Sequence, residues 1–168
     1  MAATYLRHPT ILHKMGTYTL SNTLTSNDVK AFVKDAKGQL WIGTNSGLNI
    51  SRGQRYIQLF ANMDDSTTLP GNTIFDLFKD SKEQIWVATN KGLARYEGNC
   101  HFHRYFFPHL EYGITQVCEL ADKSIAIIAD NKIYRISQNH PSLFVTIKPQ
   151  HAKWMYSQPV GGINLVHT

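Results

Sequence analysis

Hydrophobic residues between positions 27 and 60 gather in four short clusters, each separated from the next by polar residues. The clusters cover residues 29–33, 40–42, 48–50 and 55–60. Each has the length of a β-strand, and the first alternates only weakly, which is typical of a strand covered on both faces. Residues 35–38 read Asp-Ala-Lys-Gly, a turn sequence in which Asp starts the turn and Gly takes the positive φ. The pattern predicts four consecutive antiparallel strands.

The same pattern returns after a shift of 45 residues, from residue 27 to residue 72. Residues 27–48 read NDVKAFVKDAKGQLWIGTNSGL, and residues 72–93 read NTIFDLFKDSKEQIWVATNKGL. The identical pairs are Asn27/Asn72, Lys34/Lys79, Asp35/Asp80, Lys37/Lys82, Gln39/Gln84, Trp41/Trp86, Thr44/Thr89, Asn45/Asn90, Gly47/Gly92 and Leu48/Leu93. A strand-rich repeat of about 40 to 50 residues is the signature of a propeller blade. We therefore predict an all-β fold, a β-propeller with blades of four antiparallel strands.

Because the identical residues recur at equivalent positions of the two repeats, a structural role is favoured over a chemical one. The two tryptophans occupy equivalent second strands, where a large ring packs between blades, and the two aspartates occupy equivalent turns. Glu83 stands where the first repeat has Gly38, so we predict a positive φ at Glu83. The residues assigned to the structural repeat are Asp35, Gly38, Trp41, Gly47, Asp80, Trp86 and Gly92.

About three full blades and a split fourth account for the whole chain as a single propeller, residues 1–168. The third blade is degenerate, with Ala126 where the other two have Trp. Strand-like segments at both ends of the chain would together make the fourth blade. The predicted boundaries are 24–60, 72–107 and 112–147 for the full blades, and 1–15 with 152–168 for the partial blade.

Composition narrows the possible partners. The net charge is +5, but the basic residues are scattered and form no stripe for a phosphate backbone, so nucleic-acid binding is not expected. No apolar run approaches the ~20 residues that cross a bilayer, and the first residues lack the apolar stretch of a signal peptide. Cys100 and Cys118 fall on an outermost and an innermost strand, too far apart for a disulfide.

Candidate chemistry is sparse. His101, His103 and His109 lie close together in the sequence, but no Cys or carboxylate stands at ligand spacing, so we expect no metal. No nucleophile and base recur in a way that supports catalysis. We therefore expect neither an enzyme nor a cofactor.

The segments KDAKGQLWIGTNSGLNI and KDSKEQIWVATNKGLARY resemble the two-component regulator propeller repeat, with consensus Asp-x-x-Gly-x-(Leu/Ile)-Trp-(Ile/Val)-Gly-Thr-x-x-Gly-Leu. The second departs at Glu83 and Ala88. This resemblance implies the periplasmic sensor region of a hybrid two-component histidine kinase, in which seven-bladed propellers detect glycan fragments. Nothing in the chain resembles the kinase, phosphoacceptor or DNA-binding parts, so the chain would be a piece of the sensor.

The resemblance implies signal transduction by binding, with an oligosaccharide or another small extracellular ligand as partner. Ligands of propellers usually meet the face built from the second-to-third-strand turns and the loops between blades, where Asn and Asp can bond sugar hydroxyls. The candidate ligand-binding residues on this face are Asn45, Ser46, Asp64, Asp65, Asn90, Lys91, Asp130 and Asn131. Two alternatives remain open: an enzyme resembling streptogramin lyases, which need a His base with a metal, and a cytosolic protein-interaction scaffold.

Location and assembly follow from the same expectation. A sensor piece would be periplasmic within an inner-membrane protein, with its export signal outside this sequence, whereas a free-standing chain would be cytoplasmic. An incomplete propeller exposes an uncovered blade face at each end. We expect the remaining blades of a parent chain, a second copy of this chain, or closure of the two ends on each other to cover these faces.

Overall fold

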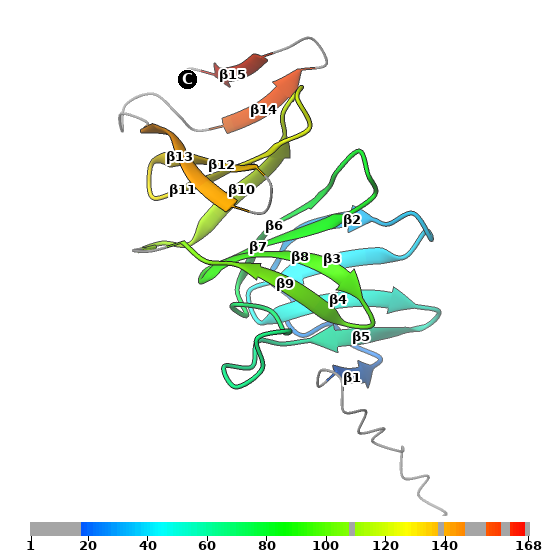
Figure 1. Cartoon of the computed structure of the whole chain (residues 1–168). Helices are drawn as coiled ribbons and strands as arrows, with labels where there is room; N and C mark the ends of the chain where they lie inside the picture. Colours follow the sequence, from blue (N-terminus) through cyan, green and yellow to red (C-terminus); the bar gives the residue numbers. More distant parts are fainter. Residues whose placement is uncertain (1–17, 108–109, 138–139, 147–153, 159–161, 167–168) are drawn as a thin grey trace, which may run out of the picture.

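A computed structural model describes residues 18–107, 110–137, 140–146, 154–158 and 162–166, and every regular element in these ranges is a β-strand (Figure 1). Three four-stranded antiparallel units follow one another along the chain. Blade one is β2 (Val29–Lys34), β3 (Leu40–Thr44), β4 (Gly47–Arg52) and β5 (Arg55–Leu59). Blade two is β6 (Ile74–Lys79), β7 (Ile85–Thr89), β8 (Gly92–Gly98) and β9 (His101–Tyr105). Blade three is β10 (Ile114–Glu119), β11 (Ile125–Ala129), β12 (Lys132–Ser137) and β13 (His140–Thr146).

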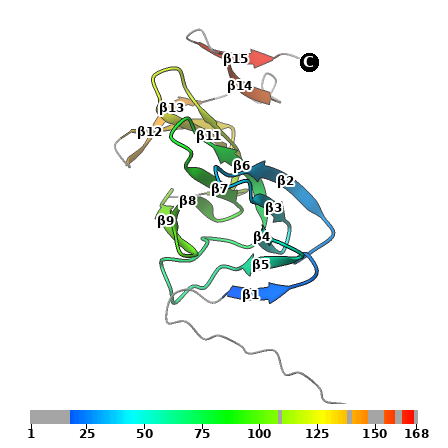
Figure 2. The same cartoon turned by 90° about the vertical axis from the view of Figure 1, so that its right-hand side faces the viewer.

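The units are arranged as successive propeller blades. Their innermost strands β2, β6 and β10 are neighbours, and a two-stranded sheet of β14 (Trp154–Gln158) and β15 (Gly162–Val166) follows, with β14 beside β10. Figures 1 and 2 show blade one and the β14–β15 sheet at opposite ends of the resulting arc. The predicted fold class is confirmed. Residues 1–15, assigned to the other half of the fourth blade, lie outside the described residues.

Blade one carries a fifth strand that the sequence pattern did not indicate. β1 (Tyr18–Ser21) pairs antiparallel with β5, with Tyr18 opposite Leu59. The outermost strand of a blade has an unpaired edge, and an added strand satisfies its backbone groups. β1 therefore lies on the outer edge of blade one, far from the innermost strands.

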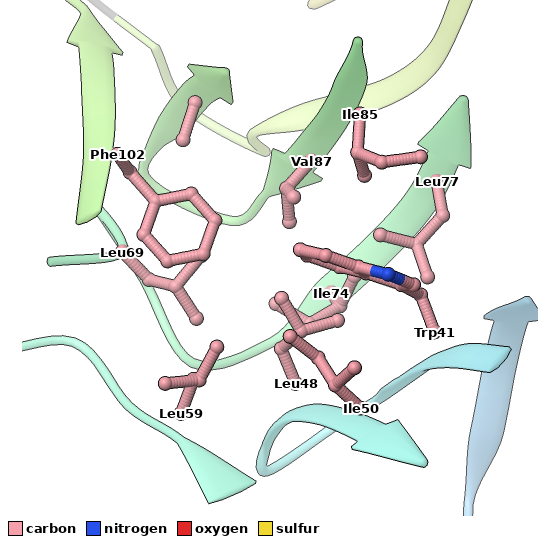
Figure 3. Packing of buried hydrophobic residues seen from close by; sticks show 11 residues of the cluster. Trp41, Leu48, Ile50, Leu59, Leu69, Ile74, Leu77, Ile85, Val87 and Phe102 are labelled. Carbon is pink, nitrogen blue, oxygen red and sulfur yellow. The ribbon is translucent and has the colours of Figure 1, made fainter. Parts of the chain in front are cut away.

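The core lies between blades. Figure 3 shows the ring of Trp41 from blade one among Ile74, Leu77, Ile85 and Val87 from blade two. Trp86 makes the equivalent contact one blade later, in a cluster with residues of blade three. Both tryptophans are buried, and each ring removes about 150 to 250 Å² from water. The repeated tryptophan thus packs blade one against blade two and blade two against blade three.

The turn between the first two strands has the same design in blades one and two. The Asp35 Oδ1 accepts hydrogen bonds from the Lys37 and Gln39 amides, and its Oδ2 accepts the Trp41 Nε1–H at 3.0 Å. Asp80 makes the equivalent bonds, with its Oδ2 2.9 Å from the Trp86 Nε1. One carboxylate thus closes the turn and orients the ring. The third residue after each aspartate has a positive φ, +79° at Gly38 and +63° at Glu83. The predicted positive φ at Glu83 is therefore confirmed.

The two cysteines are free thiols. Cys118 lies on the innermost strand β10, as predicted. Cys100 lies in the turn between β8 and β9, with φ +64°, and not on the outermost strand itself. Burial raises the pKa of the Cys118 thiol to about 11, so this thiol stays protonated and packs as a small hydrophobic group.

Candidate ligand-binding hollow

Side chains of three blades line a hollow of about 700 Å³ beside the innermost strands. We call it the inner hollow. Its walls come from β2, β6 and β10, and its rim comes from the segment before β10 and the turn between β11 and β12. The lining residues are Lys30, Phe75, Asp76, Glu111, Tyr112, Thr115, Gln116, Ile128, Asp130 and Asn131. The inner hollow therefore lies where a propeller has its central channel.

A β-bulge recurs at the same place in each innermost strand. The pairing register shifts between Val29 and Ala31 in β2, between Ile74 and Asp76 in β6, and between Ile114 and Gln116 in β10. The extra residues at these bulges are Lys30, Phe75 and Thr115, and all three line the inner hollow. Bulges beside binding sites re-aim a side chain that regular alternation would place elsewhere.

The rim is held by Asp130. This residue and Asn131 form a two-residue hairpin turn with positive φ at both positions, +49° and +58°, as a type I′ turn requires. The Asp130 carboxylate accepts hydrogen bonds from the Glu111 and Tyr112 amides at 2.8 and 2.9 Å. These bonds fix the segment that carries Tyr112, whose side chain is 73% exposed. The aromatic ring of Tyr112 therefore lies at the rim, on a backbone segment that Asp130 holds in place.

The next residue, Gly113, allows this segment to approach blade two. Its φ is +86°, and a Cβ at this position would lie 2.6 Å from the Asn90 Cα and 2.8 Å from the Thr89 carbonyl oxygen. Any side chain here would collide with backbone, so the close approach depends on glycine. The contact fixes the rim segment relative to the wall formed by blade two.

Asp76 connects the walls of blades two and three. Its carboxylate accepts the Val117 amide of β10 at 2.8 Å and the Leu77 amide at 2.9 Å. Burial raises the pKa of Asp76, and these two hydrogen bonds act in the opposite direction. On the opposite wall the Lys30 ammonium lies 2.9 Å from the Asp28 carboxylate. The carboxylates near the inner hollow thus outnumber its single ammonium group.

The structure brings only two of the eight predicted ligand residues, Asp130 and Asn131, to the inner hollow. Asn45 is used within its own blade, where its side chain donates to Asp28 and accepts from Ser46. Asp65 caps its own loop by accepting from the Thr67 amide and hydroxyl. Because short polar side chains bond their own backbone in turns, such residues are common there without any ligand. The other predicted residues that do not line the hollow are Ser46, Asp64, Asn90 and Lys91.

Sequence reasoning missed most of the lining. The missed residues are Lys30, Phe75, Asp76, Glu111, Tyr112, Thr115, Gln116 and Ile128. A signal was present for the bulge residues, since each follows an apolar residue at the start of an innermost strand, but their side chains share no chemistry. The histidines His101 and His103 lie on the outermost strand β9, away from the hollow, and His109 lies outside the described residues.

The described part of the chain has neither a cluster of metal ligands nor a membrane-spanning helix. No group of three or more His, Cys, Asp or Glu side chains there could hold a metal ion. Within the same residues, no helix has the length and hydrophobicity to span a bilayer.

The fold and the inner hollow define the class of protein as a β-propeller. Residues 23–46 and 68–91 match the family model of the two-component regulator propeller. These two segments are therefore two-component regulator propeller repeats, as the resemblance implied. A comparison with curated protein sequences found no match.

Solved structures show the same fold. The chain is similar to the extracellular domain of a protein described as a hybrid two-component system of B. thetaiotaomicron, with 15% identity and a TM-score of 0.64, over 85% of this chain and 22% of that one. A second such domain gives 17% identity and 0.58, over 83% and 28%. Virginiamycin B lyase from Staphylococcus aureus gives 12% and 0.60, over 90% and 60%. The chain thus spans from about a fifth to three fifths of these proteins.

Proposed function

We propose that the chain is a non-catalytic, ligand-binding segment of a two-component sensor propeller, and that the inner hollow binds an oligosaccharide. The observation that carries the proposal is the recurring bulge, which brings Lys30, Phe75 and Thr115 from three blades to one hollow. Bulges occur often beside binding sites, where they re-aim a side chain, and these three bulges turn side chains toward one hollow. The two-component regulator propeller repeats support the sensor context.

The chemistry of the lining favours a sugar chain. Thr115, Gln116 and Asn131 offer hydroxyl and amide groups, and the carboxylates accept hydrogen bonds from hydroxyls. Tyr112 adds an exposed ring at the rim, on which an apolar sugar face can pack. An excess of carboxylates disfavours an anionic ligand, so the proposed ligand is a neutral oligosaccharide. Such a sensor would act in the periplasm, as part of an inner-membrane protein.

The alternative is an enzyme of the lyase type, since propellers of that activity share the fold. A His base is expected for such chemistry, and the lining of the inner hollow contains none among the described residues. The described histidines lie on β9 and β13, outermost strands of their blades. Binding without turnover is therefore the proposed activity.

Titration calorimetry tests the proposal with the 168-residue chain and a panel of neutral, amino and acidic oligosaccharides. We expect a neutral oligosaccharide to bind and Tyr112→Ala to weaken its binding by about tenfold or more, equivalent to about 1.4 kcal/mol. Phe106→Ala is the matched control, because Phe106 is another exposed aromatic residue that does not line the hollow. Equal affinity of both variants would contradict the assignment of the hollow, and a cleaved or eliminated product would contradict the non-catalytic function.

A further inference from the structure

A second hollow, of about 920 Å³, lies between the outer parts of blades one and two. We call it the outer hollow. One wall comes from β1, β5 and two turns of blade one, and the other comes from β8 and the turn after it in blade two. The lining residues Tyr18, Ile57 and Tyr96 also pack against the hydrophobic cluster that joins these two blades. The outer hollow is therefore an opening in the interface between blades one and two.

The outer hollow lies at the end of the blades opposite to the rim of the inner hollow. In an antiparallel blade the turn after the first strand and the turn after the third lie at one end, and the turn after the second lies at the other. Lys37 lies in the turn after β2, and Asn99 lies in the turn after β8. Asp130 and Asn131, at the rim of the inner hollow, lie in the turn after β11. The two hollows are thus separate sites.

The open face of blade one, which is the side of this blade that points away from blade two, does not line the outer hollow. Phe32 lies on that face, 72% exposed, because it is the equivalent of Leu77, whose side chain in blade two packs against blade one. Phe32 is not among the residues of the outer hollow. A preceding blade in a longer propeller would cover Phe32, whereas the outer hollow already has both of its walls.

The charges that line the outer hollow are cationic. Lys37 contributes an ammonium group and Arg52 a guanidinium group, and none of the described residues that line the hollow carries a carboxylate. Neither cation forms an ion pair within the described ranges. The carboxylate of Asp35, in the same turn as Lys37, already accepts two turn amides and the Trp41 Nε1–H. The outer hollow therefore has the opposite charge balance to the inner hollow.

The guanidinium group of Arg52 acts across the hollow on the thiol of Cys100. Arg52 ends β4 in blade one, and Cys100 lies in the turn between β8 and β9 of blade two. Burial raises the pKa of Cys100, and the positive charge of Arg52 acts in the opposite direction. Because charge effects fade within about 10 Å in physiological salt, the two groups are close. An anion held by Arg52 would therefore lie beside Cys100.

The rest of the lining is apolar or neutral. Ile57 and the rings of Tyr18 and Tyr96 supply apolar surface, and Asn99 adds an amide. The Tyr96 ring is fixed, since it meets the Trp41 ring edge-on at 4.7 Å between centroids and its hydroxyl accepts the Cys100 amide at 3.3 Å. A preformed apolar wall beside two cations suits a ligand that has both a ring and a negative charge.

We propose that the outer hollow binds a small organic anion, with its acidic group held by Arg52 and Lys37 and its ring against the apolar wall. A planar guanidinium binds a carboxylate or sulfate through two parallel hydrogen bonds, and a lysine adds a point charge. The volume falls in the range of small-molecule sites, about 300 to 1,000 Å³. Two kinds of molecule carry this chemistry, an acidic sugar and an aromatic acid. The proposal goes beyond the proposed function, which assigns a neutral ligand to the inner hollow.

The thiol of Cys100 reports whether the outer hollow is occupied, because Cys118 is buried with a pKa of about 11 and stays protonated. The rate at which neutral dithiodipyridine modifies the 168-residue chain is measured at constant ionic strength. Benzoate and a glucuronate-containing disaccharide are the two probes, with benzamide and the corresponding glucose disaccharide as neutral counterparts. We expect at least one anion to slow the modification saturably and its neutral counterpart to have no effect. The probe that protects identifies the kind of anion.

Arg52→Gln tests the assignment against a matched control in the same hairpin. Arg52 pairs with Arg55 across the turn between β4 and β5, and both are exposed, but only Arg52 lines the outer hollow. Arg52→Gln should weaken the apparent affinity of the protecting anion by about tenfold or more. Arg55→Gln removes the same net charge and should change this affinity by about twofold or less. Each variant is compared with and without the anion, because Arg52→Gln also alters the acidity of Cys100.

Four results would overturn the proposal. They are no protection by either anion, equal protection by a neutral counterpart, equal protection by inorganic sulfate, and equal loss of affinity in Arg52→Gln and Arg55→Gln. Equal protection by sulfate would mean that the apolar wall takes no part in binding. The readout lies at Cys100, outside the inner hollow, so its outcome is separate from the calorimetric test of the proposed function.

Discussion

Blades one and two have nearly the same local structure and different surroundings. Each places an aspartate under a tryptophan, with Oδ2 to Nε1 distances of 3.0 Å at Asp35 and 2.9 Å at Asp80. Each also turns its tryptophan toward the following blade. Their opposite faces differ, because blade two is covered by blade one and blade one is covered by no other blade of the described chain. The sequence of a repeat thus determines the shape of a blade, and its neighbours determine what the blade buries.

The loops that precede β2 and β6 also differ in how they are held. Gln58 on β5 donates to the Thr23 carbonyl at 2.9 Å, and Arg104 on β9 donates to the Thr68 carbonyl at 2.7 Å. Arg104 also donates to carbonyls of the loop between the blades, which a shorter amide could not reach. The additional acceptors are Asn62, Asp65 and Leu69. A planar guanidinium with five donors therefore holds a whole loop in place, where Gln58 holds one carbonyl.

The largest expected effect on stability concerns the face of each blade that packs its tryptophan against the following blade. Trp41→Ala and Trp86→Ala should each lower the free energy of unfolding by about 3 to 5 kcal/mol, because each leaves a large cavity between blades. The costs should be similar, since both rings are buried by a following blade. Urea denaturation followed by circular dichroism measures both. A folded Trp86→Ala variant with nearly unchanged stability would break the equivalence of the two blades.

The opposite faces of the two blades differ in exposure, so truncating equivalent side chains on them should lower stability by different amounts. Leu77→Ala should cost about 2 to 5 kcal/mol, because Leu77 is buried between blades one and two. Phe32→Ala should cost less than about 0.5 kcal/mol at a protein concentration where the chain is monomeric, since an exposed side chain loses few contacts. The same denaturation experiment applies to both variants. Similar costs would mean that the open face of blade one is covered even in a single chain.

The repeat explains how much of the fold could be predicted. Turn aspartates, the glycine at position 38 and the spaced apolar clusters are local signals, and they led to the strands of all three blades. β1 could not be predicted in this way, because residues 18–21 have no counterpart in the repeat and pair with β5 only through the edge that β5 leaves open. A strand that depends on a partner's edge has little signal of its own.

The site could be predicted less well than the fold. Asp130 and Asn131 were found because a two-residue hairpin turn is readable from sequence. The bulge residues were not found, because a bulge breaks the alternation on which strand reading depends. Asp64 and Asp65 were chosen for their polarity, but Asp65 is engaged with its own loop. Turn polarity alone does not separate a ligand-binding residue from a turn-forming one.

A smaller difference is expected at the turn aspartates. Asp80→Ala should cost about 1.5 to 3 kcal/mol, because it leaves the buried Trp86 Nε1–H and two turn amides without their charged acceptor. Asp35→Ala should cost less, since Asp35 is more exposed than Asp80 and water can replace part of its bonding. Thermal unfolding of both variants compares them. A larger loss at Asp35 would show that the greater burial of Asp80 does not strengthen its turn.

The smallest expected effect lies in the same turn, at the position of positive φ where blade one has Gly38 and blade two has Glu83. Glu83 holds φ +63° with a side chain, which costs about 1 kcal/mol relative to glycine. Glu83→Gly should relieve this cost while losing the exposed ion pair with Lys79, 2.6 Å away, which is worth about 0.5 kcal/mol or less.

The net result of Glu83→Gly should be a small gain in stability, and Gly38→Glu should lower stability by about 1 kcal/mol. The nearest atom to a Cβ at Gly38 is the Lys34 Cε at 3.6 Å, so the loss would come from conformation and not from collision. Glu83→Gln serves as the control, because it removes the charge and keeps the strain, and it should lose only a few tenths of a kcal/mol. Denaturant midpoints separate the three variants. If Glu83→Gly and Gly38→Glu both destabilised the chain to the same degree, the cost of a side chain at positive φ would not explain the difference between the two turns, and the ion pair would have to outweigh the backbone strain.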